Sequence, residues 1–273
     1  MSHEPLTSEI TSINPGQYRL SMQICDDALE VLLRPVGEGE SLYRRIPYSS
    51  AAAGASARLE EAVYANPLLV SRFDRVDVLL RTPRYLLLPA DGADAASAAT
   101  ALMGWTSPRA EDITVEADRY YSLVARVDRG VAGFVGRTFD TAFVSHPMAV
   151  LARWFTSRST MGNTGKVFVN LRPDGSDIFV YNSMGLAGAT MLRSVSVPDT
   201  IYYIMAMASA AGVRRDDCEV HLAGLPERRA GLSAALRAYA PVVVPAVFPA
   251  ALASMGLAAS AAPLELSVLP LVR

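Results

Sequence analysis

The sequence has few of the side chains that most often build metal and redox sites. Its 273 residues include two cysteines, Cys25 and Cys218, and three histidines, His3, His146 and His221. No CxxC is formed, which excludes a thiolate zinc site, and both cysteines stand in or beside apolar segments that favour buried, reduced thiols. No two histidines stand at the short spacing of a zinc motif, so we expect no metal site.

Lysine is nearly absent, and charge of either sign is scarce. Lys166 is the single lysine, and its place at the start of a predicted strand indicates a solvated strand end rather than a reactive amine. Charged residues make up 19% of the chain, and the formal net charge is −2. This balance predicts no nucleic-acid partner and no anionic membrane surface.

Neither a leader nor a membrane span is expected. The stretch MSHEPLTSEITSINPGQ has no basic start and no apolar centre, so it is not typical of a signal peptide, and we expect a disordered tail over residues 1–17. The uncharged run from Ala240 to Leu264 is interrupted by four prolines. A spanning helix needs about 20 strongly apolar residues. The run therefore predicts a buried strand at 242–247 and a buried helix at 249–259.

What the sequence does contain is one order of elements that occurs twice. Three short strands in succession open each half, at 18–25, 28–34 and 41–47, and again at 166–172, 177–182 and 186–194. Helices then alternate with strands in both halves. This order predicts an α/β duplicated architecture, with an N-terminal lobe at 18–161, a C-terminal lobe at 162–273 and a cleft between them.

The first half carries additional elements. The segment RVDVLLRTPRYLLLPAD predicts two apolar strands that are buried on both faces, as in the middle of an α/β sheet. Residues 119–127 and 131–137, joined by Asp128-Arg129-Gly130, predict an extra hairpin because a glycine lies between two alternating runs. Residues 139–155 show helical periodicity that Pro147 interrupts.

Five diffuse patterns carry a resemblance to a known family. They are YRLSMQICDDALEVLLR, VDVLLRTPRYLLLPAD, KVFVNLRPDGSDIFVYNSMGLAGATMLRS, PDTIYYIMAMASAAGV and CEVHLAGLPE. Together they span about residues 18–248, and they resemble a bacterial family of unknown function with an actin-like ATPase, or ribonuclease-H-like, fold. The resemblance implies two lobes with mixed five-stranded sheets flanked by helices. Active members of this fold hold a nucleotide between the lobes, on a glycine-rich first hairpin in each lobe preceded by an aspartate, and on a late strand that ends in Gly-Gly.

The sequence departs from that pattern at all three elements. The first hairpin has no glycine; Gln23 stands near the expected aspartate, and Asp26 at the turn would repel phosphate unless Mg²⁺ lay between them. The second has Asn170 in place of the aspartate. Its Asp174-Gly175 pair is typical of a type I′ turn, which explains the glycine without a ligand.

The late strand keeps Gly224 but has Leu225 in place of the second glycine. Joint loss at three elements indicates a pseudo-enzyme. We therefore expect a cytoplasmic scaffold or protein-interaction module that has a protein partner, no catalytic residues and no cofactor. A homodimer is left open.

Two other functions compete with this interpretation. The first is an ATP-binding protein or ATPase of the actin and sugar-kinase superfamily, in which Asp26, Asn170, Asp174, Gly175 and Gly224 would hold ATP and Mg²⁺. The second is a nuclease of the ribonuclease-H type, which needs several carboxylates that converge on two metal ions. Gln23 and Asn170 are amides at the strand positions involved, which counts against the nuclease.

Overall fold

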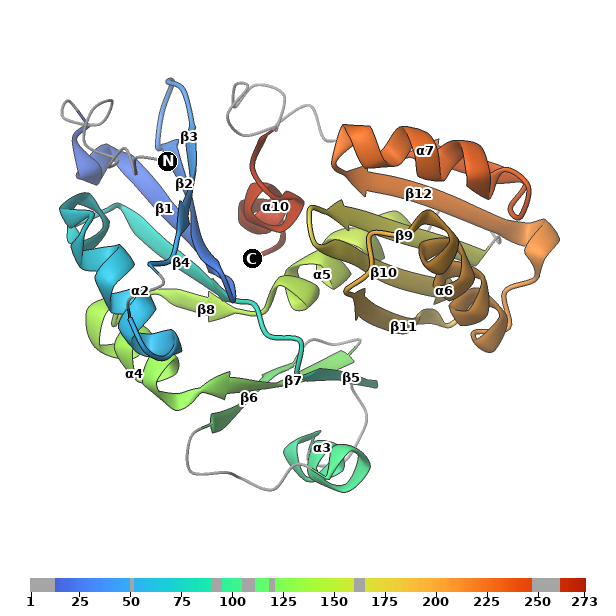
Figure 1. Ribbon diagram of the computed structural model, residues 1–273, viewed down its shortest axis with the longest axis horizontal. Helices are drawn as coiled ribbons and strands as arrows, with labels where there is room; N and C mark the ends of the chain where they lie inside the picture. Colours follow the sequence, from blue (N-terminus) through green and yellow to red (C-terminus); the bar gives the residue numbers. More distant parts are fainter. Residues whose placement is uncertain are drawn as a thin grey trace. The chain divides into compact units, whose positions relative to one another are not determined.

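The computed structural model describes residues 13–49, 52–89, 95–104, 111–117, 121–159, 165–246 and 261–273 (Figure 1). These residues form two compact units. The first contains the chain up to Pro147, and the second contains Met148 to residue 246 together with Pro263–Arg273. Most of the predicted tail lies outside the described residues, but Pro15–Gln17 form a short 3-10 helix, η1, in front of the first strand. The predicted helix at 249–259 also lies outside the described residues.

The first unit is built on a mixed five-stranded sheet in the order β3-β2-β1-β4-β8. Strand β1 runs antiparallel to β2 and parallel to β4, and β8 is parallel to β4. The strands are β1 (Tyr18–Ile24), β2 (Ala28–Pro35), β3 (Leu42–Pro47), β4 (Arg75–Leu80) and β8 (Phe143–Ser145). Helices α2 (Ala55–Tyr64) and α4 (Arg129–Thr138) contact each other and cover one face of this sheet, and the short helix η2 (Pro67–Val70) follows α2.

A second, smaller sheet is inserted between β4 and α4. Its order is β5-β7-β6, all antiparallel, and helix α3 (Ala95–Met103) contacts β7. The strands are β5 (Tyr85–Pro89), β6 (Glu111–Ala117) and β7 (Tyr121–Asp128). The expected hairpin with residues 131–137 is therefore wrong, because β7 pairs with β5 and β6 and the chain then enters α4. The Asp128 side chain accepts a hydrogen bond from Val131 N and caps this helix.

The second unit repeats the first sheet without the insertion. Its order is β11-β10-β9-β12-β13, again mixed, with β12 parallel to both β9 and β13. The strands are β9 (Gly165–Arg172), β10 (Gly175–Asn182), β11 (Gly185–Leu192), β12 (Cys218–Gly224) and β13 (Val242–Pro245). The helices are α5 (Pro147–Ser159), α6 (Val197–Ala210), the short η3 (Arg215–Asp217), α7 (Pro226–Leu236) and α10 (Leu264–Val272). The predicted duplication of a mixed five-stranded sheet is confirmed.

Strand alternation divides each sheet into two different faces. In the second unit, Val167, Val169 and Leu171 of β9 pack with residues of α6 and α7 in an apolar core. Phe168 and Asn170 alternate with them and point to the other face, where Phe168 stacks on Phe155 of α5 at 4.6 Å. Each sheet therefore has one face that is mainly apolar and one that carries most of its buried polar side chains.

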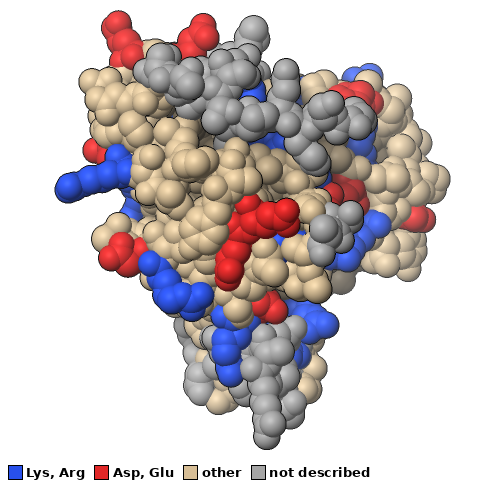
Figure 2. Space-filling model, turned by 60° about the vertical axis from the view of Figure 1, so that its left-hand side comes forward, with Lys and Arg blue, Asp and Glu red and all other residues tan. Residues whose placement is uncertain are grey.

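The surface agrees with the low net charge. On the face in Figure 2, basic and acidic side chains are interspersed over a mostly uncharged surface. Within the described ranges, no helix combines the length and the apolar character that crossing a membrane requires.

Candidate functional site

The first hairpin, between β1 and β2, ends in a glycine-free turn. Cys25 N donates to Ala28 O at 3.0 Å, and Asp26 and Asp27 form the exposed loop between them. Asp27 accepts a hydrogen bond from Arg45 Nη2 at 2.6 Å. The turn thus presents two carboxylates to solvent, and one of them is held by an arginine of β3.

The second hairpin, between β9 and β10, turns over Pro173 and Asp174, because Arg172 is opposite Gly175 in the register. A type I′ turn is wrong here, because it needs positive φ at both central residues and no non-glycine residue described has one. Gly175 has another reason to be glycine. A Cβ on this residue would lie 2.0 Å from Leu192 O of β11, so the neighbouring strand requires the missing side chain.

Both hairpins carry an amide–carboxylate pair at the same register position. Gln23 is opposite Glu30 and donates to it at 2.8 Å, and Asn170 is opposite Asp177 and donates to it at 3.1 Å. All four side chains are buried. The amides that replace the expected aspartates are thus held by the adjacent strand, so their presence follows from the packing of each hairpin.

Asn170 also reaches a second carboxylate, which comes from the end of the chain. Its Nδ2 donates to Glu265 Oε2 of α10 at 3.3 Å, and Glu265 and Asp177 both have 0% exposure. Arg172 Nε donates to Asp177 Oδ1 at 3.0 Å, and Arg172 Nη1 donates to Asp174. The Asn170 amide and the Arg172 guanidinium therefore bind three carboxylates at the end of β9, of which Asp177 and Glu265 are buried and Asp174 is exposed.

A side chain of α7 binds carbonyl oxygens of the same hairpin. Arg228 Nη1 donates to the backbone oxygens of Arg172 and Gly175, which flank the turn. Burial and the neighbouring Arg172 guanidinium lower the pKa of Arg228. The guanidinium thus links the hairpin to α7 through two hydrogen bonds.

The close approach of β12 to β9 explains why residue 224 is glycine. Its φ of +81° favours glycine, and a Cβ there would lie 2.1 Å from Leu171 O. The next residue, Leu225, donates its N–H to the same Leu171 oxygen at 2.9 Å and is the N-cap of α7. Strand pairing explains this glycine, as it explains Gly175.

A second polar cluster lies on the same sheet near the start of β9. Lys166 Nζ lies 3.4 Å from Glu219 Oε2, and His221 Nε2 lies 2.8 Å from Glu219 Oε1. The His221 ring stacks on Phe168 at 4.7 Å, and burial lowers its pKa. The expectation of a solvated Lys166 is wrong, because its side chain is only 7% exposed and pairs with the glutamate opposite it.

A family model described as "Protein of unknown function (DUF3822)" matches residues 7–243. The chain belongs to this family. Comparison with curated proteins gives no match.

One solved structure confirms the fold expected from the resemblance. A Bacteroides thetaiotaomicron protein with an actin-like ATPase fold and unknown function superposes with a TM-score of 0.73 at 17% identity, covering 85% of this chain and 91% of that one. A PilM–PilN type IV pilus biogenesis complex gives 0.47 at 12% identity, over 85% and 89% of the chains. The cytoplasmic domain of EpsL from the Vibrio cholerae type II secretion system gives 0.40 at 12%, over 77% and 82%. The first likeness shows the actin-like ATPase fold; the other two scores are too low to carry function across.

Four of the five candidate residues come together in the second unit. Asn170, Asp174, Gly175 and Gly224 all lie around the end of β9, whereas Asp26 lies at the β1–β2 turn of the first unit. No group of three or more histidine, cysteine or carboxylate side chains suited to a metal ion occurs within the described ranges.

Two residues that complete the second hairpin are absent from the sequence-based candidates. Arg228 carries no signal that distinguishes it from other helical arginines. Glu265 does carry one: it is the single charged residue in the apolar segment LELSVLPLV. A lone carboxylate in such a run indicates a buried polar partner.

Proposed function

We propose that this protein is a non-catalytic member of the actin-like fold class, which acts as a scaffold or protein-interaction module in the cytoplasm. The observation that carries the proposal is Asn170, whose amide donates to two wholly buried carboxylates, Asp177 and Glu265. An amide has no charge to offer Mg²⁺ and does not accept a proton from water as a base. In nucleotide-binding members of the fold, an aspartate at this position takes part in nucleotide binding. Here Asn170 holds α10 against the sheet instead.

The charge around the second hairpin further supports the absence of ATP chemistry. Asp174, Asp177 and Glu265 surround its end, and the Arg172 guanidinium is shared by the first two of them. A triphosphate brought to this hairpin would meet carboxylates whose like charge opposes it. The nearby Arg228 guanidinium already donates to two carbonyl oxygens beside the turn, so it is engaged by groups of its own chain.

An interaction role is supported by the outer edge of the second sheet. Strand β11 is one of the two edge strands, and its sequence GLAGATML has no charge and no proline, two features that block edge pairing. A bulge near Ala187 interrupts its pairing with β10 on the inner side. Met184, directly before this strand, is 94% exposed. We propose that an extended segment of a partner protein adds to β11 as a further strand.

The test combines nucleotide binding with partner capture. Thermal melting is measured with Mg²⁺ alone and with ATP·Mg²⁺, and phosphate release is followed over time. The chain is then used as bait beside Ala187→Asp, which places a charge on an exposed residue of β11. We expect no ATP-dependent shift and one partner that binds the native chain but not the variant. A second copy of the chain as that partner would appear as a dimer in light scattering.

The competing function is ATP binding through a divergent phosphate loop, and one observation favours it. Arg172 Nη2 and Ser176 Oγ are buried and have no hydrogen-bond partner within the described part of the chain. Both are donors of the kind that bind phosphate oxygens.

ATP binding would raise the melting temperature by about 5–10 °C at 100 times its dissociation constant. The double variant Asp26→Ala, Asp174→Ala would abolish that shift. This outcome would replace the scaffold proposal.

A further inference from the structure

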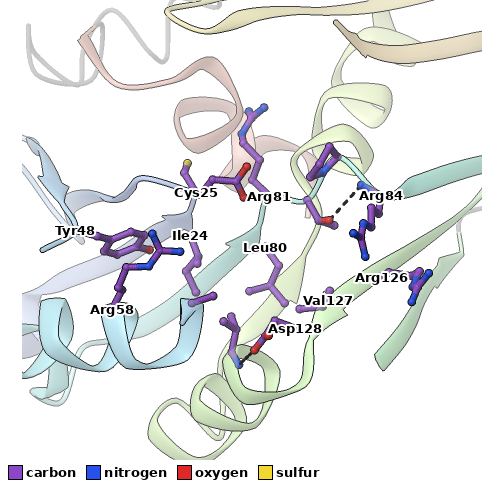
Figure 3. A pocket seen from close by; sticks show the side chains of 15 residues that line it. Ile24, Cys25, Tyr48, Arg58, Leu80, Arg81, Arg84, Arg126, Val127 and Asp128 are labelled. Carbon is purple, nitrogen blue, oxygen red and sulfur yellow. Dashed lines mark hydrogen bonds between the residues drawn. The ribbon is translucent and has the colours of Figure 1, made fainter. Parts of the chain in front are cut away.

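The first unit contains a cavity of about 300 Å³ (Figure 3). It lies where the carboxyl ends of the parallel strands β1 and β4 meet helices α2 and α4. Its walls come from residues 24–26, 80–84 and 126–128, with Ala55, Arg58, Tyr48 and Val131. Ligand cavities typically hold about 300–1,000 Å³ and favour the carboxyl ends of parallel strands. The cavity therefore has the place and the size of a small-molecule site.

Positive charge predominates in its walls. The charged lining residues are Arg58, Arg81, Arg84, Arg126, Asp26 and Asp128. Asp128 Oδ1 accepts a hydrogen bond from Val131 N at 2.9 Å, which uses this carboxylate as the cap of α4 (Figure 3). Four of the six charged lining residues are therefore arginines, a composition that favours an anionic ligand.

Tyr48 supplies an uncharged donor at one end of the cavity. Its hydroxyl oxygen is buried and has no hydrogen-bond partner within the described ranges. Burial raises the pKa of this phenol, so that it stays protonated and can donate. The Arg58 guanidinium lies 5.9 Å from the centre of the Tyr48 ring, and its Nε donates to Gly54 O at 3.3 Å. A buried donor without a partner is costly, and a ligand oxygen would satisfy it.

The first turns of two helices meet beside this end. Gly54, at the N-cap of α2, gives no side-chain cap, and Ala55 lines the cavity. A Cβ on Gly130, in the first turn of α4, would lie 2.9 Å from Ser56 Cβ, so this glycine lets α4 approach α2 closely. Backbone N–H groups at helix N-termini attract anions, which adds to the field of the arginines.

The middle of the cavity is apolar. In Figure 3, Ile24, Leu80 and Val127 lie between Tyr48 and Arg58 on one side and Arg84 and Arg126 on the other. We propose that the cavity binds a small organic anion, a carboxylate or a phosphate monoester on a short apolar body. Tyr48 and Arg58 hold the anionic group, and Ile24, Leu80 and Val127 contact the apolar part. The site lies wholly within the first unit and does not depend on the scaffold role.

The test uses three probes that share a six-carbon chain: hexyl phosphate, heptanoate and hexanol. Binding is measured by titration calorimetry and by thermal melting of the native chain and three variants. Arg58→Gln removes the guanidinium. Tyr48→Phe removes only a hydroxyl that has no hydrogen-bond partner among the described residues, so it should leave the fold intact. Arg72→Gln is the matched control, because Arg72 is exposed and does not line the cavity.

We expect at least one anion to bind and to raise the melting temperature by about 5–10 °C at 100 times its dissociation constant. Hexanol should give no shift. Arg58→Gln and Tyr48→Phe should each weaken binding about tenfold or more, as for a lost hydrogen bond to a charged group. Arg72→Gln should bind as the native chain does. Whichever anion binds identifies the head group.

Two results would overturn the proposal. One is the absence of binding by both anions up to millimolar concentration. The other is equal binding by Arg58→Gln, Tyr48→Phe and Arg72→Gln, which would place the anion elsewhere on the surface.

Discussion

The substitution Asn170→Asp distinguishes most sharply between a structural hairpin and a divergent phosphate loop at the β9–β10 turn. It restores the residue that the fold's active members carry at this position. If the hairpin were a divergent phosphate loop, the variant should bind Mg²⁺ and nucleotide better. The contacts of Asn170 predict the opposite, because the new carboxylate would face Asp177 and Glu265, both with 0% exposure.

The magnitude follows from these contacts. Asn170 donates to Asp177 at 3.1 Å and to Glu265 at 3.3 Å. A hydrogen bond to a charged group contributes roughly 1.5–3 kcal/mol. Three buried carboxylates at this spacing would not all ionise, and protonating one with an ordinary pKa costs about 4 kcal/mol at pH 7. The protonated group restores one of the two hydrogen bonds. The net destabilisation is therefore about 5–7 kcal/mol, against a total of about 5–15 kcal/mol for a typical domain.

Urea unfolding, followed by far-UV circular dichroism, measures this cost at pH 7 and again at pH 5. The deficit should shrink at pH 5, because protonation of one carboxyl becomes easier. The control is Gln23→Glu, the same exchange in the first hairpin. It should cost about half as much, because Gln23 donates to Glu30 alone and Arg45 Nε lies 3.9 Å from that carboxylate. An Asn170→Asp variant within about 1 kcal/mol of the native chain, or one that gains Mg²⁺-dependent ATP hydrolysis, would refute this reasoning.

Three further predictions concern single side chains. Gly224→Ala should lower the free energy of unfolding by about 2–4 kcal/mol in urea, because its Cβ would lie 2.1 Å from a backbone oxygen; Gly231→Ala, in the open surroundings of α7, should be neutral or stabilising by up to about 1 kcal/mol. Burial lowers the pKa of His221, so the unfolded chain binds this proton at a higher pH than the folded chain does. The free energy of unfolding should therefore decrease as the pH drops below 6.5, and this decrease should be smaller in His221→Gln. Burial raises the pKa of the Cys218 thiol to about 11, so a thiol reagent should label the half-buried Cys25 first and Cys218 only upon unfolding.

Each of these has a clear contrary outcome. Equal costs for the two glycine variants would mean that the strands part easily at Gly224. A urea midpoint for His221→Gln that follows the native chain from pH 7.5 to 5 would remove His221 as the source of acid sensitivity. Labelling of Cys218 at the rate of Cys25 would show that β12 opens in the native state.

Most of the correct secondary-structure predictions rest on the alternation of apolar residues in strands and on the residues at turns and helix starts. Alternation predicted β1, β2 and β3 and again β9, β10 and β11, because a period of two has no other common cause in short segments. Helix α6 (Val197–Ala210) has equally clear local signals, because Ser196 caps its start and its first turn holds a proline. The amides Gln23 and Asn170 were also identified as departures from the fold's usual aspartates.

The failures occur where local pattern is ambiguous. Residues 131–137 alternate well enough for a strand, yet Val131, Phe134 and Val135 share one face of α4 and are buried. Strand β8, three residues long, lies inside a stretch that reads as helical. Strand β5 was expected to be buried on both faces but belongs to the small inserted sheet, where Tyr85 to Leu88 are only half-buried. In each case, contacts with distant segments outweigh local preference.

The sequence by itself determined the repeated strand order, the absence of a glycine at the first hairpin and the amide at position 170, because these are properties of neighbouring residues. Only the tertiary structure decided what that amide does. Glu265 stands 95 positions away along the chain, and folding brings its carboxylate to Asn170. The arginine-lined cavity is likewise assembled from segments between residues 24 and 131. Contacts between distant segments depend on how whole elements pack, which no local pattern encodes.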